Sequence, residues 1–489
     1  MNNLKKSIIF FIFVLLSLQC ERDSIPEDAI IAYAGQHPID WKLLHRSFEL
    51  NPQWKKGLTQ KHAYLRQLDY LIDEKLFAQA AISDGLLQDS LLAGYLKFIQ
   101  EKELVKELYR QEIASRVEIS EQEYQDAYQK LKRQVKFSYV YTPSFSQAEQ
   151  YAQELKTKTI EEIQLFEPTH DIKGITPFIA FGELRQEVEE KVFTLAPGEI
   201  SAPLAVDNGY MIVKVIDGRV DLFMSELDFA ERKNKIQKVI FERKAEKVSN
   251  AYVKKLMADK DLQLNPPVFF ALSLEFSKII KNKFSVEPLP IYVNDSELQE
   301  ARDNLSSLLP QTLITFRGGK MTVAEFLREL SCMPPDLRPN VKMAPQLKDA
   351  IGVIVRNKYL ANEARRKKLD KTAKVRWEIQ AQSDEILARY WLQKKYQDIL
   401  VTEDAVESFK HSADFLEFLK NSSKEIDDQL IYNFLHLQKL SRYKVLWADS
   451  LKTKYTVKID TSRLVQNIKN PEMMIKENPV PMVVRELYY

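Results

Sequence analysis

The chain has 489 residues, too many for one compact hydrophobic core, so two to four domains are expected. Glycine is scarce, with 12 residues, and 29% of the residues are charged, a composition that indicates long helices with solvated faces. The net charge of +2 falls to zero without the first nineteen residues, which contain Lys5 and Lys6 and no acidic residue, so the sequence predicts no basic surface for nucleic acid.

The N-terminus reads as a secretory signal over residues 1–19. Its apolar run, residues 8–18, is shorter than the roughly 20 residues of a membrane-spanning helix. The sequence Leu-Ser-Leu-Gln-Cys ending at Cys20 resembles a bacterial lipobox, which implies acylation of Cys20 after cleavage; an uncleaved anchor is the alternative. Residues 20–28 then form a tether, and the body is expected on the periplasmic side of a bacterial membrane, lipid-anchored through Cys20. Cys332 is left without a disulfide partner and is expected to be a small buried apolar residue.

Residues 29–134 have the pattern of a small helical lobe. A short strand and a turn precede a helix start at Asp40, and an amphipathic helix over residues 68–86 ends near Gly85. Two further helices follow, the second capped by Ser120 with Glu123 three residues later. The sequence of this region resembles the N-terminal chaperone domain of SurA-, PpiD- and PrsA-type proteins.

Residues 135–218 have a different character, because strand patterns and turns are concentrated there. An apolar β-branched run over residues 135–142 predicts a strand, residues 146–156 predict a helix, and Asn208-Gly209 indicates a hairpin. The stretches FTLAPGEIS (193–201) and GYMIVKV (209–215) resemble the parvulin (PpiC) family of peptidyl-prolyl isomerases. The predicted fold class is therefore α+β and mostly α-helical, with one inserted parvulin-like α/β domain.

The resemblance also implies a site. The two strand histidines of the family correspond here to Tyr139 and Met211, and the apolar seat for a proline ring corresponds to Leu184, Val188 and Phe193. Tyrosine keeps a hydroxyl donor, but a thioether is only a weak acceptor, so a relay between two imidazoles cannot form. We therefore expect isomerase activity to be weak or absent.

The chain after this domain repeats its beginning. Writing Gly35 above Gly318 puts Lys75 above Lys358 without a gap, and Ser120 falls above Thr402 after the register slips by a single position. The sequence thus predicts a second SurA-like lobe over residues 312–420. The remaining segments are predicted as a return helix packing on the first lobe (219–267), a connection (268–311), a second return helix and strand (421–460), and a tail (461–489).

No other chemistry is indicated. The six histidines lack metal-ligand spacing, and the glycines at 318–319 lack the spacing of a phosphate loop, so neither a metal, a nucleotide nor another cofactor is expected. These observations favour an ATP-independent, membrane-tethered periplasmic chaperone for unfolded envelope and outer-membrane polypeptides. An active parvulin isomerase and a scaffold subunit of an envelope complex are the alternatives.

Overall fold

The computed structural model describes residues 29–50, 57–168, 170–206, 209–220, 226–283, 293–339, 341, 343–421 and 427–469. The predicted signal, the tether with Cys20, Asn208 and the end of the tail lie outside the described residues. Two compact units form: unit 1 contains residues 29–108 and 259–469, and unit 2 contains residues 109–258. Helices predominate and three small sheets accompany them, so the α+β, mostly helical class is confirmed. Within the described ranges, no helix combines the length and apolar character that a membrane span requires.

The first repeat begins unit 1 with a hairpin and three helices. Its elements are β1 (Ile30–Ala34), β2 (His37–Asp40), α2 (Trp41–Leu50), α3 (Gln60–Ser83) and α4 (Ser90–Glu112), whose last residues extend into unit 2. The Asp40 carboxylate accepts a hydrogen bond from the Leu43 amide at 2.7 Å and so starts α2. Gly85, with a φ of +74°, provides the left-handed turn by which the chain leaves α3.

The second repeat follows the same plan. Its elements are β8 (Thr312–Phe316), β9 (Gly319–Thr322), α11 (Val323–Ser331), α12 (Ala344–Arg366), α13 (Ala373–Gln397), α14 (Glu403–Lys410), α15 (Ala413–Asn421) and α16 (Asp428–Lys454). The start of α13 follows the start of α4 at the same offset that separates Lys358 from Lys75, and Lys368 takes the left-handed conformation of Gly85. The hairpins are related by an offset that is shorter by a single position, so Gly35 corresponds to Arg317 and not, as predicted, to Gly318.

The repeats exchange their last strand and helix. After unit 2 the chain forms β7 (Gln263–Leu264) and α9 (Pro266–Lys283), and near its end it forms β10 (Val457–Ile459) and α17 (Thr461–Lys469). The strand orders are β10-β1-β2 and β7-β8-β9, so each hairpin is completed by the strand that ends the other repeat. The prediction that residues 219–267 return to the first lobe is wrong for the strand at their end, because β7 pairs with β8. Strands of two or three residues, such as β7 and β10, are too short for their sequence to indicate which strand they pair with.

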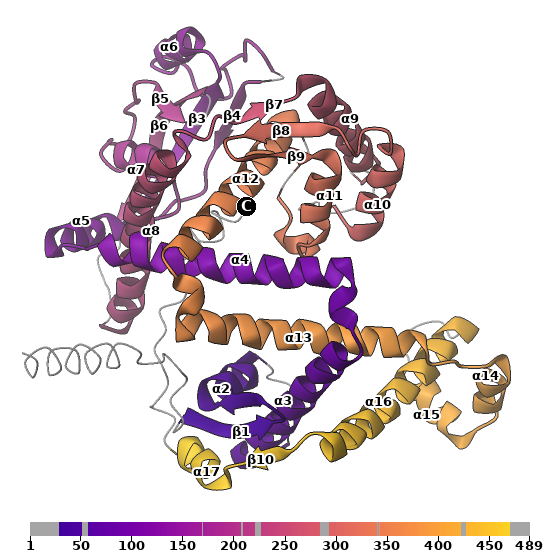
Figure 1. The fold of residues 1–489 in the computed structure, drawn as a ribbon. Coiled ribbons are helices and arrows are strands. Elements are labelled where there is room, and N and C mark those ends of the chain that lie inside the picture. The colour runs from indigo at the N-terminus through magenta and orange to yellow at the C-terminus, as the bar shows by residue number, and fades with distance from the viewer. Residues whose placement is uncertain are drawn as a thin grey trace, which may run out of the picture. The chain divides into compact units, whose positions relative to one another are not determined.

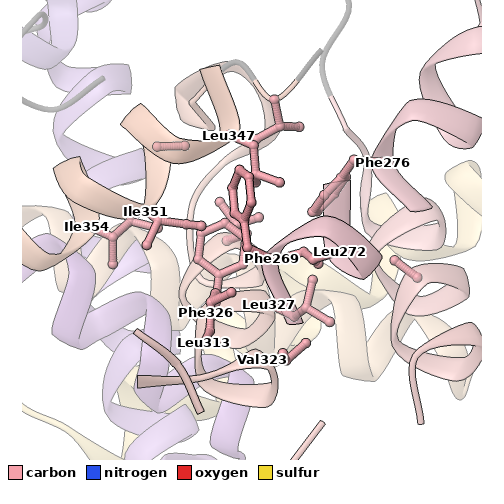
Figure 2. Packing of buried hydrophobic residues seen from close by; sticks show 14 of the residues in the cluster. Phe269, Leu272, Phe276, Leu313, Val323, Phe326, Leu327, Leu347, Ile351 and Ile354 are labelled. Carbon is pink, nitrogen blue, oxygen red and sulfur yellow. The ribbon is translucent and has the colours of Figure 1, made fainter. Parts of the chain in front are cut away.

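The core of the second lobe shows why residues 268–311 are more than a connection. Helix α9 contributes Phe269, Leu272 and Phe276 to a cluster that also contains Phe326 of α11 and Leu347 of α12 (Figure 2). Helix α10 (Asp295–Asn304) adds further apolar side chains to the same cluster. In the first lobe α17 corresponds to α9, because it contributes the buried side chain of Leu464 to the core of that lobe.

Helix α13 leaves its own lobe to pack along α3 of the first repeat (Figure 1). The rings of Phe77 and Trp391 stack with centroids 5.3 Å apart, and the Trp391 indole donates a hydrogen bond to Asp84 at 2.8 Å. Lys75 and Asp384 form an ion pair at 3.0 Å with side chains that are each 1% exposed. Burial by itself would raise the pKa of Asp384, but the hydrogen bond to His37 and the Lys75 charge lower it below its usual value.

Unit 2 contains a four-stranded sheet with helices on both faces. Its elements are α5 (Glu121–Leu131), β3 (Arg133–Thr142), α6 (Phe145–Glu154), β4 (Ile172–Ile175), α7 (Gln186–Val192), β5 (Leu204–Val206), β6 (Gly209–Val220) and α8 (Glu226–Met257). The strand order is β4-β3-β6-β5, and all pairs are antiparallel. Helix α6 packs on one face through Ala148 and Tyr151, and α7 packs on the other through Val188 and Val192.

Candidate functional site

The five predicted site residues meet on the face of the sheet that α7 covers. Val188 and Phe193 are buried in one apolar cluster there, and Leu184, Tyr139 and Met211 are partly buried against it. The alternation of side chains along a strand explains the arrangement. Tyr139 of β3 lies opposite Val213 of β6, and Met211, two residues from Val213, points to the same face.

The polar groups at this face are few. Among the described residues, no side chain hydrogen-bonds the Tyr139 hydroxyl, and the Met211 thioether offers only a weak acceptor. Tyr139 lies directly beside β4, because a Cβ added at Gly174 would come within 3.0 Å of its hydroxyl oxygen. The three side chains predicted to form the seat thus share one apolar cluster, while a polar network for stabilising a twisted amide is not built from the described side chains beside it.

An ion pair from α8 holds the loop that carries Leu184. The Arg243 guanidinium donates to the carboxylate of Glu189 at 2.7 Å and to the backbone carbonyl of Leu184 at 3.2 Å. Glu189 is fully buried and also accepts the backbone amide of Gly182 at 2.6 Å. Arg243 therefore fixes the position of one side of the seat from outside the sheet.

The same loop inserts a side chain between two helices. Phe181 is buried with Tyr124 of α5 and with Ile236 and Ile240 of α8, and the Arg243 guanidinium lies 5.1 Å from its ring centroid. Sequence reasoning did not identify Glu189 or Arg243. Glu189 carries a weak signal, since it falls on the buried side of α7 beside Val188 and Val192. Arg243 carries none, because it is one of many charges on a long helix.

The opposite face of the sheet has a polar group that is not aimed at the seat. The Tyr151 hydroxyl donates to Asp171 at 2.6 Å and accepts the Phe166 amide at 2.7 Å. Burial, together with the hydrogen bond to Asp171, raises the pKa of Tyr151 to about 12. These bonds join α6 to the segment before β4, so they are structural. Across the described residues, no group of three His, Cys, Asp or Glu side chains is arranged to hold a metal ion.

Residues 106–220 match the family model of the PPIC-type PPIase domain. The chain therefore contains a PPIC-type PPIase domain, in agreement with the resemblance of residues 193–215. It is also similar to the foldase protein PrsA of Geobacillus sp. (strain WCH70), with 26% identity over 178 residues. That alignment covers 33% of this chain and 62% of the relative, less than two thirds of its length.

Two solved structures are also similar. PrsA of Bacillus anthracis has 18% identity and a TM-score of 0.21, with 44% of this chain and 97% of that chain covered. A chain from the pair of SurA-like chaperones PEB4 and Cj1289 of Campylobacter jejuni has 16% identity and a TM-score of 0.22, with 48% and 100% covered.

Proposed function

We propose that this protein is an extracytoplasmic, membrane-tethered and ATP-independent chaperone for unfolded envelope polypeptides, with a PPIase domain of weak or no activity. The observation that carries the proposal is the composition of the site: Leu184, Val188 and Phe193 share one apolar cluster beside Tyr139 and Met211. Among the described residues, no polar network joins these side chains. Such a site can hold a chain segment by apolar contact. It has little means of stabilising the transition state of rotation about the amide, whose barrier is roughly 18–20 kcal/mol.

The duplicated helical lobes support a holding function. They expose several large apolar side chains to solvent: Phe270 and Leu274 of α9, Leu416 and Leu419 of α15, and Leu437, Val445 and Leu446 of α16. Scattered apolar contacts of this kind are individually weak, so a client held by several of them is released without nucleotide hydrolysis. The similarity to a foldase agrees with clients of this class.

The membrane tether of the proposal depends on Cys20. A fatty acyl chain on that residue, detected by mass spectrometry of the N-terminal peptide, is the expected result. The Cys20→Ser variant should move from the membrane fraction to the soluble fraction after cell fractionation. Retention of the variant in membranes with its first nineteen residues present would instead support the uncleaved anchor.

Two assays on the purified chain test the proposal. In a refolding reaction limited by prolyl isomerisation, the protein should leave the slow rate nearly unchanged, whereas it should suppress aggregation of an unfolded outer-membrane protein. A clear acceleration that Phe193→Ala or Leu184→Ala abolishes would establish the alternative, an active isomerase. Failure to suppress aggregation at stoichiometric amounts, together with co-purification of one fixed partner, would favour the scaffold.

A further inference from the structure

A cleft opens in unit 1 between α4 of the first repeat and α11 and α12 of the second. Its volume is about 250 Å³. The apolar part of its lining consists of Ala93, Phe98, Cys332, Met333 and Ile354, and its charged lining residues are Lys97, Glu101, Arg328, Glu329 and Lys358. Gly94 also lines the cleft, and a Cβ there would come within 2.1 Å of the Cys332 sulfur, so glycine lets α4 lie directly against the end of α11.

In the other repeat, the position that corresponds to Gly94 carries an aromatic side chain. The helix that corresponds to α4 is α13, and the offset between the starts of these two helices places Trp377 at the position of Gly94. The Trp377 ring lies against the core of the first lobe, with the Arg46 guanidinium 4.8 Å and the Lys42 ammonium 4.6 Å from its centroid. An aromatic side chain therefore covers the arginine of α2 in one lobe.

The arginine of the other lobe has no such cover from α4. Arg328 of α11 corresponds to Arg46 of α2 when the first residues of these two helices are aligned. Arg46 has both the Trp377 ring and the Glu378 carboxylate, at 2.9 Å. Arg328 is exposed, and Gly94 stands at the position that corresponds to Trp377. Among the described residues, no carboxylate lies within ion-pairing distance of Arg328.

We propose that the α4–α12 cleft binds an aromatic side chain of an unfolded polypeptide, which packs on Met333 and Ile354 and stacks on the Arg328 guanidinium. This inference rests on the proposed chaperone function and specifies that the cleft selects aromatic side chains of the client. A guanidinium attracts the face of an aromatic ring and is more weakly hydrated than an ammonium, so aromatic residues are preferred over aliphatic ones of similar size. A single site of this kind is weak, as a client that must be released requires.

The test measures binding of short blocked glycine–serine peptides that differ only in a central Trp, Leu or Ala. The full chain should bind the Trp peptide most tightly by calorimetry, and that peptide should slow alkylation of Cys332, followed by mass spectrometry of the peptide containing it. Ala93→Trp fills the cleft from an exposed position and should abolish both effects. The matched control is Leu91→Trp, on the other side of α4 and 42% exposed, which should bind as the unchanged chain does.

Arg328→Gln should weaken the Trp peptide about three- to tenfold and leave the Leu peptide nearly unaffected, with Arg328→Lys between them. Equal affinity for the three peptides, or binding that survives Ala93→Trp, would overturn the site. Faster alkylation of Cys332 in a Tyr488→Ser, Tyr489→Ser variant without peptide would also overturn it, because the chain's own end would then be the occupant. If Ala93→Trp abolishes peptide binding while the unchanged chain does not suppress aggregation, the site stands and the chaperone function fails.

Discussion

The two repeats share one backbone plan but close their helix pairs differently. In one pair α3 packs on α13 around the buried Lys75–Asp384 ion pair. In the other, α12 faces α4 across a cleft whose lining includes Lys358, the counterpart of Lys75. Lys358 forms its ion pair with Glu329 of α11, at 2.9 Å, instead of reaching across to α4. A few side chains therefore decide whether the same pair of helices forms a sealed core or an open cleft.

Each repeat also has an arm, which is the helix pair α5 and α8 in the first repeat and α14 and α16 in the second, and the two arms differ as well. In unit 2, α5 and α8 pack around Phe181, which the PPIase domain inserts between them. In unit 1, α14 and α16 have no such domain, and α15 brings Phe415 and Phe418 onto Phe409. An arm that lacks the inserted domain thus supplies its own aromatic core, which explains how the second repeat remains packed without a second PPIase domain.

The largest expected effect comes from breaking the sealed pair. Lys75→Met leaves the Asp384 carboxylate buried without its ammonium partner and should lower the free energy of unfolding of unit 1 by about 3–5 kcal/mol. Urea unfolding followed by tryptophan fluorescence measures it, because Trp41, Trp377, Trp391 and Trp447 belong to this unit and the sequence of unit 2 has no tryptophan.

The counterpart in the open pair is the matched control for that variant. Lys358→Met removes a lysine whose side chain is 30% exposed, and the loss should stay below about 1 kcal/mol. Equal losses for the two variants would show that the cleft side is as tightly built as the sealed side.

The Arg243 ion pair tests what holds the first arm to the PPIase domain. Arg243→Met leaves the fully buried Glu189 carboxylate without a cation and should destabilise unit 2 by about 3 kcal/mol. Hydrogen exchange of the amides in α7 and α8 measures the loss. The double variant Arg243→Met, Glu189→Met should recover most of it, and a double variant as unstable as the single one would contradict the ion-pair explanation.

The exchange of end segments is tested in the two cores. Leu464→Ala should cost about 2–3 kcal/mol, because a buried leucine of α17 is replaced by a cavity in the first lobe. Its partner variant, Leu272→Ala of α9, should weaken the second lobe by a similar amount. Hydrogen exchange should accelerate in β1 for the first variant and in β8 for the second. The reverse pattern would contradict the observed strand pairing.

Local signals explain how much of this could be predicted from the sequence. Ser120 and Thr402 cap helices as predicted, since each side chain accepts an amide within its own first turn. The predicted site residues lie together because strand alternation and one helix turn place them. The exchange of β7 and β10 could not be predicted, because strands of two or three residues carry no information about their partner. The Arg243–Glu189 pair and the cleft depend on residues distant in sequence, for which one sequence gives no pairing signal.

The smallest expected effect concerns the caps of the two arms. Glu123 completes a capping box with Ser120, whereas Ala405 stands at the corresponding position beside Thr402. Hydrogen bonds from Lys244, then from the Ser120 amide and hydroxyl, lower the pKa of Glu123 from 4.5 to about 2. A carboxyl with a lowered pKa stabilises the folded state fully above 4.5, and this stabilisation is lost as the pH falls from 4.5 to 2.

Glu123→Ala gives the first arm the alanine that the second arm has at this position. The free energy of unfolding of unit 2 should therefore lose this pH dependence, and at the lower end of that pH range the variant should be about as stable as the unchanged chain. Hydrogen exchange of the α5 amides, corrected for the intrinsic rates at each pH, measures it. An unchanged pH dependence in the variant would mean that another carboxyl of unit 2 is responsible. Asp171 is the group to test next, because its pKa is also lowered: burial would raise it, but the hydrogen bonds from the Tyr151 hydroxyl and the Glu167 amide lower it.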